Sequence, residues 1–301
     1  MKLRPDVQLR CVKAALGTGC RDASTATSNV SLALFVAAGV AVVLGGPAAT
    51  RRALTFEECD AKVAGAERDE LAALEYAAHA IGGETADRVW AAQRKAAADV
   101  VKVTGGGKGV LYAVVGSSPD KVGFILRHRG LRTATVLFSR VFMPNRDGAL
   151  DTDDAYRQKK LRQFKTRVVA PLRKELAALP DGEACEIAFV DYADTGNTFA
   201  ALFAMLEAAA PDLAARSYPV IMQTPRAWSS DDAMGINLAS MRPRARVVII
   251  PGYFWLFSKL SRCVPAVGAN GKTSETTAMD AALCNAARMF VAHRLRRQQK
   301  T

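Results

Sequence analysis

The chain has 301 residues, half of them hydrophobic, and a formal net charge of +12. This composition excludes a wholly disordered chain, because enough apolar surface is present to form a core. The length suits one large α/β domain with extensions or two small domains. The positive charge favours phosphates, nucleic acid or anionic lipid as partners, although a bias towards Ala and Arg raises the charge without any such partner.

Residues 1–54 form an atypical N-terminal extension with an uncharged segment, residues 30–44. This segment is shorter than the roughly 20 apolar residues of a spanning helix, and it begins late for a signal-peptide core. It predicts a targeting or membrane segment or, slightly favoured, a buried or flexible extension. None of the six cysteines belongs to a Cys-x-x-Cys pair, and Cys185 and Cys284 fall in a predicted strand and helix. We therefore expect buried small residues at both positions and a reducing, cytoplasmic location.

Residues 55–108 are predicted to be a helical addition. Apolar residues at helical spacing indicate one helix over 56–81 and a second over 85–103. Gly82 and Gly83 separate the two, and a glycine-rich run, 104–109, ends the second.

Residues 109–260 alternate between strand and helix signals and form the predicted main domain. Strands are expected at 110–115, 133–142, 187–190, 219–223 and 246–250, and helices at 120–129, 155–179 and 199–209. Strands that alternate with helices indicate a mainly parallel central sheet with helices on both faces, a Rossmann-like α/β fold. Residues 261–301 add a C-terminal loop and an amphipathic helix, 276–297, with a basic end.

The most informative segment follows the predicted strand 187–190. It reads Asp191-Tyr192-Ala193-Asp194-Thr195-Gly196-Asn197-Thr198 and leads into the helix 199–209. Backbone amides of a small-residue loop and of a helix N-terminus attract a phosphate, and two carboxylates can meet sugar hydroxyls, a metal ion or a proton. The same residue types also occur in an ordinary polar turn with a helix cap, so that interpretation stays open.

This segment resembles the diphosphate-sugar signature of the type I phosphoribosyltransferases. Asp194-Thr195-Gly196-Asn197-Thr198 matches the second half of the signature and is most similar to the purine-salvage branch. The first half departs, because Val190 stands where the first acidic residue is expected and Tyr192 and Ala193 replace aliphatic residues. The resemblance covers about residues 109–260.

The resemblance implies a role for each matching residue. Thr195, Gly196, Asn197 and Thr198 would bind the ribose 5′-phosphate, and Asp191 would hold a ribose hydroxyl and Mg²⁺. Asp194 would take or hold the proton of the incoming base. The substrates implied are phosphoribosyl diphosphate and a nucleobase-like acceptor, and a homodimer is an expected assembly.

Three further segments fit the order of such a domain. Gly116, Ser117 and Ser118 follow the first strand and would bind pyrophosphate, and residues 144–154 would close over the site. The aromatic residues after the last strand, Tyr253, Phe254 and Trp255, would stack on a base or, as aromatic residues more often do, pack in the core.

Two basic helical segments give the alternative hypothesis. The helix 155–179 has an apolar stripe for the core and many cations elsewhere, and the tail 294–300 is also basic. Such cations indicate either a solvated face or a surface that attracts phosphate or nucleic acid. The sequence thus predicts a phosphoribosyltransferase or, because of Val190, a non-catalytic relative acting as a structural or nucleic-acid-binding protein.

Overall fold

The computed structural model describes residues 52–106, 109–116, 119–136, 138, 154–180, 182, 184–193, 196–224, 244–254 and 278–299, together with five positions between 37 and 44. The chain separates into two compact units. The sheet unit comprises Ala96–Ile250 and Ala266–Ser274. The helical unit comprises Met1–Lys95, Pro251–Pro265 and Glu275–Thr301.

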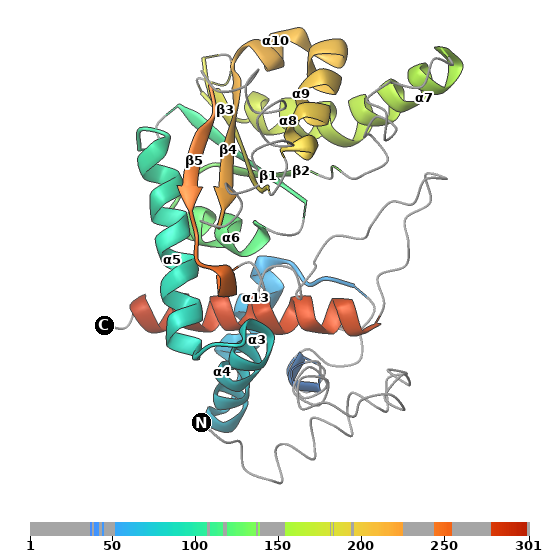
Figure 1. The fold of residues 1–301 in the computed structure, drawn as a ribbon. Helices are drawn as coiled ribbons and strands as arrows, with labels where there is room; N and C mark the ends of the chain where they lie inside the picture. The colour runs from blue at the N-terminus through green and yellow to red at the C-terminus, as the bar shows by residue number, and fades with distance from the viewer. Residues whose placement is uncertain are drawn as a thin grey trace. The chain divides into compact units, whose positions relative to one another are not determined.

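The sheet unit contains five parallel strands in the order β2-β1-β3-β4-β5 (Figure 1). Every neighbouring pair is parallel, which confirms the predicted α/β class. β3 is longer than predicted and includes Asp191 and Tyr192. Of the β-rich stretch 133–142, four residues form a strand, and most of the remainder lies outside the described residues. The strands are β1 (Val110–Val115), β2 (Thr133–Val136), β3 (Glu186–Tyr192), β4 (Ser217–Gln223) and β5 (Arg246–Ile249).

β1 is an uninterrupted apolar run, and β3 and β4 are apolar in their central residues, because helices cover both faces of the sheet. All residues of β1 and β4 are buried. Successive residues of a strand point to opposite faces. Leu111 and Ala113 join a core cluster with Phe164, Leu172 and other residues of the helices after β2 and β3. Val114, on the other face, faces Gly123 so closely that a Cβ there would lie 2.9 Å from its Cγ2 atom, so glycine allows that helix to pack against β1.

The helices of the sheet unit largely follow the predictions. The basic helix 155–179 is one helical run interrupted by a π-helical segment, and its predicted apolar stripe packs in the core. One short helix, α10, was not predicted. The helices are α6 (Asp120–His128), α7 (Asp154–Phe164), the π-helical segment η4 (Lys165–Val169), α8 (Ala170–Ala177), α9 (Asn197–Ala209) and α10 (Pro211–Ala215).

The predicted helix 56–81 is instead two helices, α3 (Phe56–Ala64) and α4 (Arg68–Gly82). α3 begins with a capping box between Thr55 and Glu58. α4 ends at Gly82, as predicted from the Gly82-Gly83 pair. Gly83 caps the helix in a left-handed conformation with φ 67°. α5 (Ala86–Val103) follows and crosses from the helical unit into the sheet unit.

The C-terminal helix α13 (Ala278–Gln299) is not amphipathic, so that prediction was wrong. All residues from 281 to 293 are buried, and α13 packs against α3 and α4. A helix enclosed on all sides needs no polar stripe, which explains its run of Ala, Met, Phe and Val. Cys185 and Cys284 are both buried, as predicted. Cys284 on α13 is in addition disulfide-bonded, whereas Cys59 and Cys185 are free.

Of the uncharged segment 30–44, only five positions lie within the described residues. They are helical, and Ala37, Gly39, Val40 and Ala41 are buried. Within the described parts of the chain, no helix has both the length and the apolar character needed to span a membrane.

Ion pairs hold the second half of α13 against three other helices. Arg294 pairs with Glu75 on α4 and, at 2.7 Å, with Asp87 on α5. His293 Nε2 lies 3.3 Å from the same Glu75 carboxylate, whose side chain is only 12% exposed. Arg296 forms two hydrogen bonds, 2.6 and 2.8 Å long, with Asp60 on α3. Glu75 is therefore the enclosed acceptor between α4 and α13.

Replacing Glu75 by Ala should destabilise the helical unit by about 3–5 kcal/mol, because Arg294 and His293 would stay enclosed without their shared carboxylate. The matched control is Glu84→Ala in the i,i+4 pair with Arg88, whose side chain is 60% exposed. Such a pair contributes about 0.3–0.5 kcal/mol. Urea unfolding measures both variants. Equal losses would show that Glu75 contributes no more than a surface charge.

Candidate functional site

The carboxyl ends of β1 and β3 form the switch point of the sheet. From β1 the chain passes through α6 to β2 on one side, whereas β3 lies on the other side of β1 and continues outward to β4 and β5. The connections after β1 and β3 therefore leave in opposite directions, and ligands of open parallel sheets bind in the resulting crevice. Because Val114 pairs with Val190, the loops that follow the two strands begin side by side at one edge.

Two glycines shape these loops. Gly116, directly after β1, has φ 69°, and Gly196, directly before α9, has φ 71°. Residues with a Cβ rarely adopt this left-handed conformation. Gly196 is also the N-cap of α9 and provides no side-chain hydrogen bond to its first amides. No N-cap side chain thus competes for the first amides of this 13-residue helix, and helix N-termini attract phosphate through such amides and through the positive end of the helix dipole.

Asp191 supplies a buried acid at the same edge. Asp191 is only 9% exposed, and the backbone amide of Tyr192 donates a 2.7 Å hydrogen bond to the Oδ1 atom of Asp191. Burial raises the pKa of Asp191 from its ordinary value of 3.8 to about 8, although the Tyr192 hydrogen bond opposes this shift. At neutral pH the carboxyl group is therefore mainly protonated and can donate a hydrogen bond to a ligand oxygen.

Val190 explains how the chain departs from the phosphoribosyltransferase signature. It points to the face opposite Asp191, and its register partners are Val114 on β1 and Val220 on β4. All three valines are buried. A carboxylate at position 190 would be buried among these valines. In the first half of the signature, the chain therefore has one acidic residue, Asp191, where the signature has two.

Gln223 is a site residue that the sequence reasoning missed. It ends β4, two residues beyond Ile221, the register partner of Asp191, so Gln223 and Asp191 share a sheet face. Its side chain is fully buried, and neither amide atom bonds to a described group. A buried unbonded amide costs about 1–3 kcal/mol, which a ligand can offset by pairing with it. The only signal in the sequence was a polar residue closing an apolar run.

Lys121 is a second residue that was missed. It lies in the first turn of α6, five residues after Gly116, and is completely buried together with Asp120. The loop after β1 has no cation of its own, so Lys121 is the basic residue nearest to it in sequence on α6.

The structure gathers only part of the predicted site. Gly116, Asp191 and Gly196 lie at the carboxyl edge, and Asn197 and Thr198 begin α9 directly beside it. Asp194, Thr195, Ser117, Ser118, Trp255 and nearly all of the expected lid, residues 144–154, lie outside the described residues.

The expected base-stacking residues belong to the helical unit. Phe254 is fully buried, so its ring has no face open to a base, and the packing alternative holds for it. Tyr253 is partly exposed, and the Arg88 guanidinium lies 5.2 Å from the centre of its ring. Stacking on a base stays a prediction for Tyr253.

The described residues do not fit a dedicated magnesium site. Among them, no group of three or more His, Cys, Asp or Glu side chains is close enough to hold a metal ion. No chemical step is therefore assigned to a protein-bound metal ion.

Comparisons with protein-family models, curated proteins and solved structures found no match to this chain.

The raised pKa of Asp191 predicts how stability changes with pH. The contribution of Asp191 is most favourable below pH 3.8 and is lost as the pH rises to about 8, because over that range the unfolded chain releases a proton that the folded chain retains. Asp191→Asn should therefore be more stable than wild type by several kcal/mol at pH 8, and the difference should shrink towards pH 4.

Urea unfolding across this pH range measures the effect. Asp212→Asn, on the exposed surface of α10, is the control and should follow the wild-type profile. A constant difference between Asp191→Asn and wild type would contradict a protonated Asp191.

Proposed function

We propose that the chain is a phosphoribosyltransferase-like protein that binds phosphoribosyl diphosphate at the carboxyl ends of β1 and β3. The observation that supports this most is the pairing of these two strands, because the loop after β1 and the signature loop that leads to α9 therefore begin at the same end of the sheet. Two separate signals in the sequence thus converge on one edge of the sheet. Had the two loops lain far apart, the resemblance would have been accidental.

The proposed binding mode gives each part of the ligand a partner. The α9 N-terminus, with Thr195 to Thr198, holds the 5′-phosphate, and Gly116-Ser117-Ser118 holds the diphosphate. The protonated Asp191 donates a hydrogen bond to a ribose hydroxyl oxygen. Gln223, whose side-chain amide bonds to no described residue, hydrogen-bonds the acceptor. Mg²⁺ accompanies the diphosphate and is held mainly by its oxygens and water.

In the proposed transfer, the bond from the anomeric carbon to the diphosphate oxygen breaks, and a bond from that carbon to a base nitrogen forms. The electron pair of the broken bond leaves with pyrophosphate. Asp194 accepts the proton that the nitrogen releases. The role of the α9 N-terminus is to fix the phosphoribosyl group so that the base attacks in line with the departing pyrophosphate.

A non-catalytic relative is the second candidate, and the valine row favours it. Val190 stands where the signature has its first acidic residue, and it is buried between Val114 and Val220, where a carboxylate would lose its hydration without gaining a polar partner. In this case the chain binds the sugar phosphate without transferring it.

Calorimetry with phosphoribosyl diphosphate and Mg²⁺ tests the proposal. Gly196→Ala should weaken binding at least tenfold, because a Cβ disfavours the left-handed backbone that presents the α9 amides. Gly130→Ala is the matched control: Gly130 is also left-handed, with φ 76°, but precedes β2 at the opposite edge of the sheet. Both substitutions should cost about 1–2 kcal/mol of stability, and only the first should affect binding.

Absence of binding at millimolar ligand, or equal weakening by both substitutions, would overturn the proposed site. If the wild type binds, pyrophosphate release with a panel of nucleobases separates the two candidates. Release that Asp194→Asn abolishes identifies the transferase. Binding without release from any base identifies the non-catalytic relative.

A further inference from the structure

The two basic segments of the sequence, 155–179 and 294–300, differ in how many of their cations form ion pairs. In the tail, Arg294 pairs with Glu75 and Asp87, and Arg296 pairs with Asp60. These two arginines form ion pairs within the helical unit, and the pairs hold α13 against the neighbouring helices. The tail therefore offers much less free positive charge than its sequence indicates.

Most cations of the helical run α7-η4-α8 whose side chains the structure describes form no ion pair with another described residue. Arg173 is an exception, since its guanidinium lies 2.9 Å from Asp212 on α10. Five other basic residues of this run form no ion pair with any described residue: Lys159, Arg162, Lys165, Arg167 and Lys174. Four of the five are exposed, and Arg167 is partly exposed. We name these five residues the cation row.

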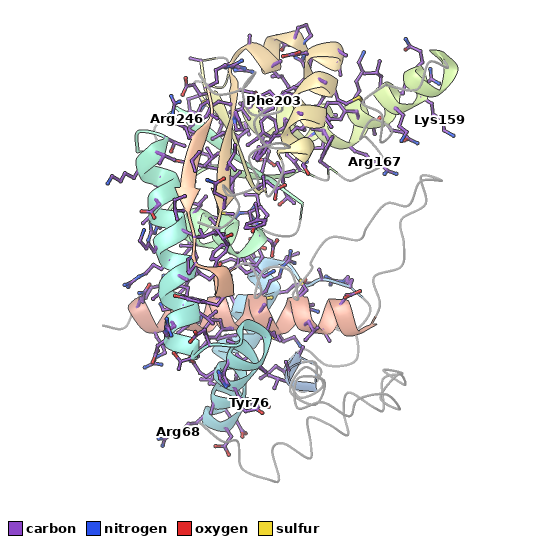
Figure 2. The ribbon with its side chains drawn as sticks, in the orientation of Figure 1. Arg68, Tyr76, Lys159, Arg167, Phe203 and Arg246 are labelled. Carbon is purple, nitrogen blue, oxygen red and sulfur yellow. The ribbon has the colours of Figure 1, made fainter. Side chains whose placement is uncertain are left out.

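The cation row lies away from the core. Phe164, Val168, Leu172 and Leu176 are buried against the sheet, so their side of the helical run is occupied. Lys159, Arg162 and Lys165 follow one another at three-residue spacing and therefore lie along one side of the helix. Figure 2 shows Lys159 and Arg167 extending away from the strands. From Lys159 to Lys174 the helical run extends about 20 Å.

The chemistry of this surface fits the backbone of a nucleic acid. Duplex DNA carries one negative charge per about 1.7 Å of its axis, so a 20 Å row of cations meets many phosphates. A membrane-binding helix needs apolar side chains to insert, and a protein interface usually has an apolar centre. Among the described side chains, the only large exposed hydrophobic one is Ile249 on β5, outside this helical run.

We propose that the cation row binds the phosphate backbone of nucleic acid without sequence specificity. This interaction is independent of the site at β1 and β3 and does not depend on the function proposed there. Phosphate contacts of this kind position a protein on nucleic acid and carry no sequence information.

Fluorescence anisotropy with a labelled 25-base-pair duplex tests the proposal. Five phosphate contacts predict a slope of log K against log salt of about −4.5, so affinity should fall about 10²–10³-fold between 50 and 200 mM salt. The triple variant Lys159→Gln, Arg162→Gln, Lys165→Gln should reduce the size of that slope by about 3.

The matched control is the triple variant Lys62→Gln, Arg68→Gln, Arg94→Gln, which removes the same charge from exposed residues of the helical unit. It should keep a slope near that of the wild type. Circular-dichroism melts confirm that both variants are folded. A second duplex of unrelated sequence should bind equally, and vesicles containing phosphatidylserine should bind more weakly than the duplex at equal salt.

Three results would overturn the proposal: a flat salt response of the wild type, equal loss in both triple variants, or preference for the vesicles over the duplex. The first would exclude backbone binding altogether. The second would assign the attraction to net charge alone, and the third would assign the surface to a membrane.

Discussion

The parallel pairing of β1 with β3 is the constraint on which the candidate site depends. β1 is apolar throughout and β3 is apolar from Ile187 to Val190, so both strands are stable only inside a sheet that helices cover on both faces. Once they pair in the register Val114 to Val190, Gly116 and the loop that ends in Gly196 must start at the same edge. The α9 N-terminus and the buried Asp191 follow from the same register, because both continue directly from β3.

That burial also sets the chemical character of the site. Adjacent residues on β3 point to opposite faces of the sheet. Val190 therefore packs among buried valines on one face, while the carboxyl group of Asp191 is buried on the other face, near the carboxyl end of β3. Without a cation bonded to it among the described residues, that carboxyl group is more stable as the neutral acid. The side-chain amide of Gln223, on the same face, forms no hydrogen bond with any described residue either. The edge thus holds polar groups that a ligand can pair with.

Much of the sheet was predictable from the sequence, because a continuous apolar run bounded by turn residues indicates a buried strand whatever its partners are. β1 was predicted residue for residue, and β3 was placed but ended too early, since Asp191 looked like the first residue of a turn. The order of the strands could not be read from the sequence. Gln223 and Lys121 were missed for the same reason, because only tertiary packing shows that a polar residue is buried.

The charges show most clearly what sequence alone leaves open. The segments 155–179 and 294–300 look equally basic, and only the fold brings Glu75, Asp87 and Asp60 from three other helices to the second of them. Likewise, helical periodicity predicted an amphipathic α13, whereas packing against α3 and α4 buries it on all sides. Pairing between distant segments decides both outcomes.

The most direct test of the central claim is whether the loops after β1 and β3 act as one anion site. In an amide NMR titration with inorganic diphosphate, the Gly116 and Gly196 resonances should shift together and fit one dissociation constant. The left-handed Gly130 at the opposite edge should stay unchanged. Shifts confined to the cation row, or different dissociation constants for Gly116 and Gly196, would contradict a single site at the switch point.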